Sequence, residues 1–157
     1  MKPEIWNLEL SILITIYNFE ITEFVAGLHR LSAACGMVFE IVCFDDGSEE
    51  KFKTVNRTIS SYEKVRYVEL DKNIGRSRIR NQLAKDAKYG YLLFFDCDSK
   101  ITSENFVRKY LDNISADGVV YGGRSYEPNP PSDNKKFLRW HYGVHREFVP
   151  LETREKN

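Results

Sequence analysis

Short apolar runs alternate along this chain with segments whose apolar residues recur at helical spacing. The runs are LSILITI at 10–16, FEIVCF at 39–44, VRYVEL at 65–70, YLLFF at 91–95 and GVVY at 118–121. Their short length and the turn residues around them predict strands rather than helices. Because the strands are largely apolar on both faces, helices must cover both sides of the sheet. The alternation therefore predicts an α/β fold with a mostly parallel sheet between helix layers.

Glycine and serine residues mark the expected ends of the helices. Gly36 follows a segment of helical spacing and is expected to end the first helix. Ser48 and Ser103 stand where their hydroxyl groups could cap the N-termini of later helices. The helix after Ser48 is expected to bury a stripe formed by Phe52, Val55 and Ile59.

The composition is that of one soluble globular domain, so residues 1–157 are treated as a single domain. The 23 basic residues balance the 23 acidic ones. Nucleic-acid-binding domains usually carry a basic excess, so no nucleic-acid partner is expected. The three cysteines form no paired motif, which favours reduced thiols and a cytoplasmic location. No apolar run has the length or setting of a signal peptide or a transmembrane helix.

Polar clusters follow four of the expected strands. They are TIYN at 15–18, DDGS at 45–48, NIGR at 73–76 and DCDS at 96–99. Ligands of parallel α/β sheets bind beyond the carboxyl ends of the strands. We therefore expect the four clusters to gather along one rim of the sheet and to form a single binding site there.

Asp96 and Asp98 carry the sharpest chemical signal of the rim. In an extended chain, residues two apart point to the same side, so both carboxylates would converge on one spot. Two such charges repel each other unless a cation lies between them. Carboxylate oxygens favour Mg²⁺ or Mn²⁺, which substrate phosphates commonly share. The alternative is a solvated turn that holds no ligand.

Asp45 and Asp46 are adjacent, so they cannot both face the same way. One is expected to hold the turn or to cap the following helix. The other would remain free to accept hydrogen bonds from a base or a ribose. DDGS is also favourable turn chemistry that needs no ligand, and taken alone the motif favours this second interpretation.

Three arginines stand at the start of the helix expected at about 77–88, namely Arg76, Arg78 and Arg80. A helix N-terminus with arginines attracts phosphate groups. Arg78 is expected on a wet face.

Arg80 differs from Arg78, because a helical wheel places it within the apolar arc formed by Ile79, Leu83, Ala84 and Ala87. A charge on that face is costly unless it is paired. We therefore expect a buried salt bridge from Arg80 to a carboxylate at a neighbouring strand end: Asp45, Asp46 or Asp96.

Together these motifs resemble family 2 glycosyltransferases, which have the GT-A fold. ITIYN, FDDGS, NIGRSRIRN and FFDCDS occur in the family's order and approximate spacing, and the nucleotide-binding part would be 10–126. The resemblance implies a metal-dependent transfer of a sugar, with inversion, from a nucleotide-diphosphate donor such as a UDP-sugar. The acceptor would be a hydroxyl of a saccharide or lipid-linked molecule in polysaccharide biosynthesis. The enzyme would act in the cytoplasm or at the inner face of the membrane.

The resemblance also implies a role for each residue of the rim. Thr15 and Tyr17 would line the base, and Asp46 would bind the base or the ribose. Arg76 and Arg80 would support the diphosphate. Asp96 would lie near the ribose, and Asp98 would contact the metal.

One departure from the family pattern concerns the catalytic base. Family members usually continue with strands that supply an acidic base and the acceptor surface, whereas this sequence ends at LETREKN. Glu147 and Glu152 are the late acids, and neither follows a recognisable core strand. The catalytic residue is therefore left unassigned. The sheet is expected to be incomplete at its C-terminal side, with exposed apolar surface that favours self-association.

Two other functions compete with a glycosyltransferase. Haloacid-dehalogenase-like phosphatases also carry DxD after a strand, but they commonly have Thr or Val two places beyond the second acid, where this chain has Lys100. Their motif also opens the fold, whereas here it follows the fourth strand. The second alternative is a sugar-nucleotide-binding module without catalysis, which would bind a donor and transfer nothing.

Overall fold

The computed structural model describes residues 8–115, 118–123, 125–150 and 153 of the chain. The chain divides into two compact units, Met1–Ser115 and Ala116–Asn157. The first unit contains the sheet and all four polar clusters of the rim.

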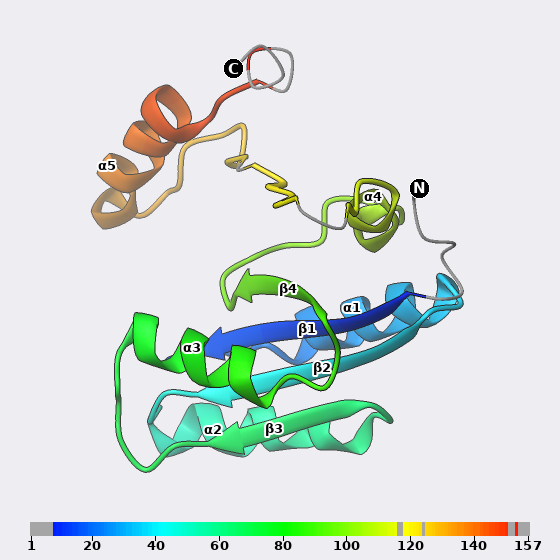
Figure 1. Ribbon diagram of the computed structural model, residues 1–157. Helices are drawn as coiled ribbons and strands as arrows, with labels where there is room; N and C mark the ends of the chain where they lie inside the picture. The colour runs from blue at the N-terminus through cyan, green and yellow to red at the C-terminus, as the bar shows by residue number, and fades with distance from the viewer. Residues whose placement is uncertain (1–7, 116–117, 124, 151–152, 154–157) are drawn as a thin grey trace. The chain divides into compact units, whose positions relative to one another are not determined.

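A four-stranded parallel sheet forms the centre of the first unit, in the order β3-β2-β1-β4 (Figure 1). The strands are β1 (Glu9–Ile16), β2 (Val38–Asp45), β3 (Val65–Glu69) and β4 (Tyr91–Asp96). Their bounds agree closely with the first four apolar runs of the sequence. The parallel sheet predicted from the alternation of runs is confirmed.

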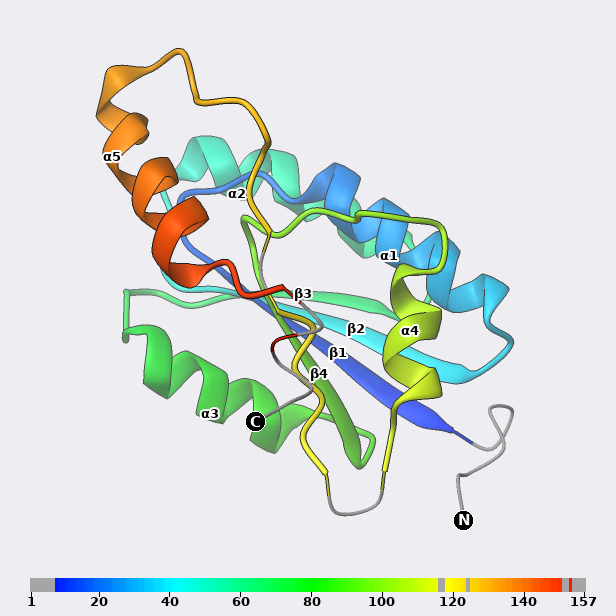
Figure 2. The ribbon, with the colours of Figure 1, turned by 90° about the horizontal axis from the view of Figure 1, so that it is seen from above.

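Helices lie on both faces of this sheet, as the apolar strands require (Figure 1, Figure 2). They are α1 (Thr22–Ala34), α2 (Glu50–Asn56), the 3-10 helix η2 (Arg57–Ser61), α3 (Arg76–Asp86) and α4 (Phe106–Asp112). α3 covers one face, and the other helices lie on the opposite face. Gly36 follows α1 with a φ of +69°, a conformation that glycine adopts readily.

Each face of the sheet has its own apolar core, because side chains alternate along a strand. Ile12 and Ile14 of β1 pack in the core that includes Leu28 of α1. Leu13 points the other way and packs with Leu83 of α3. The sheet is thus fixed from both sides, which leaves its carboxyl edge as the place for loops and polar residues.

Two predicted helix caps are wrong. The N-cap of α2 is Glu49, and the Ser48 hydroxyl instead accepts a hydrogen bond from the Asn18 N–H at 2.8 Å. The N-cap of α4 is Asn105, and the Ser103 hydroxyl is buried with no hydrogen-bond partner among the described residues. For Ser48 the reason is competition, because the Asn18 N–H of another loop bonds to its hydroxyl. Ser103 stands two residues before the N-cap of α4 and so lies outside the capping position.

The stripe predicted for the second helix is also only partly correct. α2 ends at Asn56, and the chain continues as the tighter η2, so Phe52, Val55 and Ile59 do not share one continuous α-helical face. Ile59 is buried, whereas Val55 is exposed and Phe52 is only half-buried.

The second unit contains α5 (Asn134–Tyr142) and a π-helical turn, η3 (Gly143–Glu147). Asp133 caps α5 by accepting a hydrogen bond from the Lys135 N–H at 2.9 Å. The Tyr126 hydroxyl donates to Glu147, which also accepts two hydrogen bonds from Arg139 at 2.6 and 3.0 Å. Gly143 leaves room for the Tyr126 ring, since a Cβ there would come within 2.2 Å of it.

The fifth strand predicted at 118–121 is wrong. These residues have no regular secondary structure, and the sheet of the described chain has only β1 to β4. The side chain of Val119 is 96% exposed. An apolar run forms a strand only where a neighbouring strand pairs with its backbone, and GVVY has no such neighbour among the described residues.

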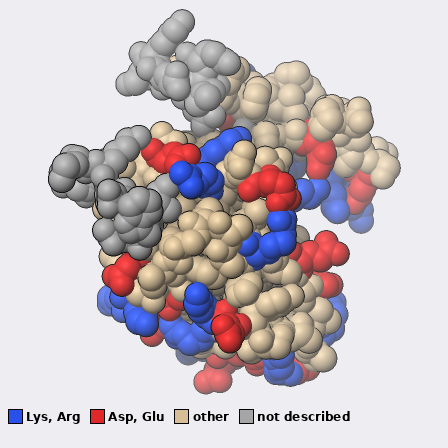
Figure 3. Space-filling view, turned by 90° about the vertical axis from the view of Figure 1, so that its right-hand side faces the viewer, with Lys and Arg blue, Asp and Glu red and all other residues tan. Residues whose placement is uncertain are grey.

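Basic and acidic side chains are interspersed on the face that Figure 3 shows, as the formal net charge of zero leads one to expect. No large field of one sign covers this face.

Candidate functional site

The register of the strands gathers the four polar clusters at one edge of the sheet. Thr15 lies opposite Asp96 of β4, and Ile16 lies opposite Asp45 of β2. Asp45 in turn lies opposite Glu69 of β3. The single rim predicted from the sequence is confirmed as an arrangement of the backbone, and its side chains divide into two groups.

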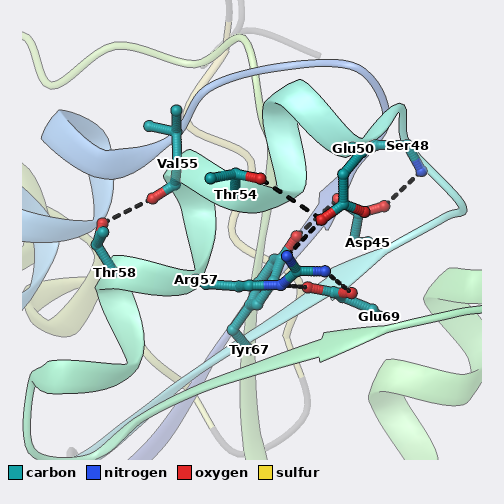
Figure 4. A network of polar contacts seen from close by, with 9 residues as sticks. All are labelled: Asp45, Ser48, Glu50, Thr54, Val55, Arg57, Thr58, Tyr67 and Glu69. Carbon is teal, nitrogen blue, oxygen red and sulfur yellow. Dashed lines mark hydrogen bonds and ion pairs between the residues drawn. The ribbon is translucent and has the colours of Figure 1, made fainter.

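Asp45 is fully buried and holds the turn after β2 (Figure 4). Its Oδ1 accepts a hydrogen bond from the Ser48 N–H at 2.6 Å, and its Oδ2 accepts one from the Tyr67 hydroxyl at 2.9 Å. Burial and the hydrogen bond to Asp45 raise the pKa of Tyr67 well above its usual value. Tyr67 therefore stays protonated and remains a donor to Asp45 at any ordinary pH.

An ion-pair cluster lies beside this turn (Figure 4). Arg57 donates to Glu69 at 2.7 and 2.9 Å and to Glu50 at 2.5 Å. Arg57 and Glu50 are largely exposed and Glu69 is partly exposed, so the contribution of these pairs to stability is small. The cluster joins η2 to the end of β3 and borders Tyr67.

Asp46 holds the loop after β3. Its Oδ1 accepts from the Ile74 N–H at 2.7 Å, and its Oδ2 accepts from the Gly75 N–H at 3.1 Å. Both carboxylates of the DDGS turn thus hold donors of the protein itself, as the turn interpretation predicts, and neither is without a partner in the chain. Gly47 allows the loop to come close, since a Cβ there would lie 2.7 Å from the Asn73 nitrogen.

Two asparagines that the sequence analysis did not single out complete the loops. Asn18 has a φ of +50°, and its Oδ1 accepts from the Glu49 N–H at 2.8 Å, which ties the loop after β1 to that after β2. Asn56 is fully buried, accepts from the Ile21 N–H at 3.0 Å and donates to the Phe19 carbonyl at 2.8 Å. Asn18 lies in the TIYN motif, but no local pattern marks Asn56.

Asp96 forms the second group, with two arginines of α3. Its Oδ2 lies 2.5 Å from the Arg76 guanidinium, and its Oδ1 lies 2.5 Å from that of Arg80. The salt bridge predicted from Arg80 to a strand-end carboxylate is confirmed. The pair is part-buried rather than fully buried: the Arg80 side chain is 36% exposed, whereas its Nε is buried and has no hydrogen-bond partner among the described residues. The Arg80 guanidinium also lies 5.9 Å from the centre of the Phe94 ring.

The chain is not extended between Asp96 and Asp98, so the extended-chain premise for converging carboxylates does not hold. β4 ends at Asp96, and the chain turns, with the Ser99 N–H donating to the Asp96 carbonyl at 3.1 Å. Asp98 is exposed, and no residue in the described part of the chain forms a hydrogen bond or an ion pair with its side chain. Cys97, between the two acids, packs against the core, and burial raises the pKa of its thiol.

These contacts change the argument for a metal. A cation was expected between Asp96 and Asp98 because two unpaired carboxylates repel each other. Asp96 is not unpaired, since it forms ion pairs with Arg76 and Arg80. Within the described ranges, no group of three or more His, Cys, Asp or Glu side chains is placed to hold a cation. Asp98 nevertheless fits a cation shared with a ligand, since Mg²⁺ often takes one carboxylate and completes its shell with phosphate oxygens and water.

The residues expected to line a base remain accessible. Tyr17 is 54% exposed at the end of β1, and Thr15 is half-buried. The structure thus brings Thr15, Asp96 and the two arginines to one part of the rim, and leaves Tyr17 open to solvent beside it.

Comparison with known proteins identifies the family of this chain. The model of glycosyl transferase family 2 matches residues 11–156, so the chain belongs to that family. The phosphatase alternative is therefore wrong.

Individual relatives are distant. The chain is 28% identical over 127 residues to the teichoic acid poly(glycerol phosphate) polymerase of Staphylococcus epidermidis, covering 78% of this chain and 17% of that protein. It is 28% identical over 141 residues to the hyaluronan synthase of Pasteurella multocida, covering 88% of this chain and 14% of that protein. The chain thus spans less than a fifth of the length of these relatives.

A solved structure supports the fold. The crystal structure of residues 1–349 of S. aureus TarS matches with a TM-score of 0.54 and 22% identity, covering 67% of this chain and 32% of that chain. The expected GT-A-type α/β fold is confirmed at this level. In the described part of the chain, no helix combines the length and the apolar character that a membrane span requires.

Proposed function

We propose that the rim binds the nucleotide-diphosphate part of a sugar donor, with a UDP-sugar as the first choice. The observation that carries this proposal is the grouping of Arg76, Arg80, Asp96 and the exposed Asp98 at the carboxyl edge of the sheet. Cationic forks bind phosphate oxygens well, and a carboxylate beside them can share a divalent cation with the same phosphates.

On this proposal the rim has a nucleoside half and a phosphate half. Thr15 and Tyr17 line the base, and the ribose lies beside Asp96. Asp46 serves the same half by fixing the 73–75 loop through two backbone donors. Because each carboxylate oxygen has a second lone pair, Asp46 could still accept from a ribose hydroxyl at the edge of the loop.

The reaction we propose is inverting transfer of the sugar to an acceptor hydroxyl. Arg76 and Arg80 would stabilise charge that develops on the leaving diphosphate, and Asp98 would hold Mn²⁺ or Mg²⁺, which supplies further electrostatic stabilisation. We assign no catalytic base. Glu147 is already held by the Tyr126 hydroxyl and by two hydrogen bonds from Arg139. The acceptor we propose is a saccharide or lipid-linked molecule, used at the cytoplasmic side of the membrane.

Calorimetric titration with UDP tests the donor site. Binding is expected in Mn²⁺ and is expected to weaken roughly tenfold or more in a chelator, as a loss of charge-assisted contacts of this kind would cause. Asp98→Asn should abolish the metal dependence. Glu9→Gln is the matched control, because it removes one exposed acid at the amino end of β1, away from the carboxyl edge.

The outcomes separate the remaining alternatives. Equal affinity with and without chelator would remove the metal from the proposal. No binding of UDP, CDP or GDP under any condition would refute a nucleotide site. Binding of a UDP-sugar without transfer to any acceptor would favour the module without catalysis.

A further inference from the structure

The Asp96 carboxylate is bound on both oxygens by side chains of the same helix. Arg76 and Arg80 each lie 2.5 Å from one oxygen, and they stand one helical turn apart on α3. The Asp96 side chain is 29% exposed, so it lies at the surface of the rim. Both of its oxygens are nevertheless occupied by the two arginines. Any cation that approaches Asp96 meets two positive charges at hydrogen-bond distance from it.

The two arginines are not equivalent. Both form an ion pair with Asp96. The Arg80 side chain is 36% exposed and also lies over the Phe94 ring, whereas the Arg76 side chain is 65% exposed. Arg76 is also the first residue of α3, directly after Gly75, so it stands at the positive end of the helix. Of the two, Arg76 can leave Asp96 for a phosphate oxygen at lower cost.

We propose that Arg76 withholds Asp96 from a divalent cation until a diphosphate binds, an inference that rests on the proposed donor site. Without nucleotide, Asp98 is the acid left open to a cation, and binding is weak. When a diphosphate arrives, Arg76 moves to its oxygens and one oxygen of Asp96 becomes available. Arg80 continues to hold the other oxygen, which keeps the carboxylate oriented.

The exchange makes cation and nucleotide binding mutually dependent. Each ligand removes a cost that the other would otherwise meet, and linkage requires the effect to be equal in both directions. This predicts opposite effects of removing Arg76. The cation alone should bind more tightly, because Asp96 is freed, and the nucleotide with the cation should bind more weakly, because a phosphate partner is lost.

The test uses Arg76→Gln, with Mn²⁺ binding followed by the paramagnetic resonance of free Mn²⁺ and UDP binding followed by calorimetry. Mn²⁺ alone is expected to bind about threefold to tenfold more tightly than to wild type, as removal of one nearby positive charge predicts. UDP in saturating Mn²⁺ is expected to bind about tenfold more weakly.

Two further variants exclude a general charge effect. Arg78→Gln removes the same charge two residues away, where the arginine is exposed and forms no ion pair with a described residue, and it should leave Mn²⁺ affinity close to wild type. Arg76→Gln combined with Asp96→Asn should lose the gain in Mn²⁺ affinity, because that gain is transmitted through Asp96.

Different outcomes test the withholding role of Arg76 and the donor site. If wild type binds UDP with Mn²⁺ but Arg76→Gln leaves Mn²⁺ affinity unchanged or lower, the withholding role is overturned while the donor site stands. An equal gain in Arg78→Gln would overturn it as well. If wild type binds no nucleotide, the donor site is refuted, and tighter Mn²⁺ binding by Arg76→Gln would still show that Arg76 withholds Asp96.

Discussion

The rim after β1, β2 and β3 is built differently from the rim after β4. In the first part, buried side chains bond to the backbone of neighbouring loops: Asp45 to the Ser48 N–H, Asp46 to the 73–75 loop and Asn56 to the loop before α1. In the second part, partly exposed side chains bond to one another, as Asp96 does to Arg76 and Arg80.

The difference has a physical consequence for binding. Buried acceptors that satisfy backbone donors are costly to rearrange, because opening the loop leaves polar groups unpaired away from water. Exposed ion pairs are weak and exchange readily with other charged groups. We infer that the first part of the rim is preformed, whereas the part after β4 adjusts to its ligand. Substitutions should therefore cost much more stability in the first part.

The largest effect is expected for Asp45→Ala. The substitution leaves the Ser48 N–H and the Tyr67 hydroxyl without their acceptor in a fully buried place. Loss of a charged acceptor with two buried donors is expected to cost about 3 kcal/mol in the free energy of unfolding. Urea denaturation measures this change, and Asp98→Ala, at an exposed position, should stay within about 0.5 kcal/mol of wild type. Equal effects of the two would remove the contrast between the two parts of the rim.

A smaller effect is expected for Gly47→Ala. Gly47 has a φ of +75°, and an added Cβ would lie 2.7 Å from the Asn73 nitrogen and 3.0 Å from the Lys72 Cα. Strained backbone and close approach together are expected to cost about 2 kcal/mol.

Gly36→Ala provides the control for Gly47→Ala. Gly36 has a similar positive φ, +69°, but a Cβ there would have nothing within 4 Å. Only the conformational cost remains, about 1 kcal/mol. Urea denaturation measures the free energy of unfolding of both variants. An equal loss in the two would show that the close packing of the 72–73 loop against the DDGS turn does not contribute to stability.

The contrast between the two parts also explains what the sequence could predict. The Arg80–Asp96 pair was predictable, because helical spacing places Arg80 beside the apolar arc and a strand boundary places Asp96 at the same edge. The contacts of Asp46 were not predictable, because its partners are backbone N–H groups 28 and 29 residues away. Every residue except proline has a backbone N–H, so the sequence does not show which one will donate. Ser48 failed as a helix cap for the same reason, since Asn18 competes for its hydroxyl from a distant loop.

The fold was predictable where a pattern depends on burial alone. Four apolar runs became the four strands of the sheet, because each is covered by helices on both faces. GVVY at 118–121 has the same composition, but composition does not supply a strand to pair with. Periodicity therefore predicted which segments are buried, and partners remote in sequence decided the polar contacts.

The smallest effect is expected for Arg80→Ala. A fully buried pair would make this a change of about 3–5 kcal/mol, since the abandoned carboxylate would stay desolvated. Here the Arg80 side chain is 36% exposed, and Asp96, 29% exposed, keeps Arg76 as a partner. Both facts lower the cost, to about 1 kcal/mol. Arg78→Ala, on the exposed side of the same helix, should cost less than about 0.5 kcal/mol.

Combining Arg80→Ala with Arg76→Ala should cost more than the sum of the single variants, because Asp96 then loses both partners. Strict additivity in urea denaturation would show that the two arginines stabilise Asp96 independently, and a loss above about 3 kcal/mol for Arg80→Ala alone would show that this part of the rim is as rigid as the DDGS turn.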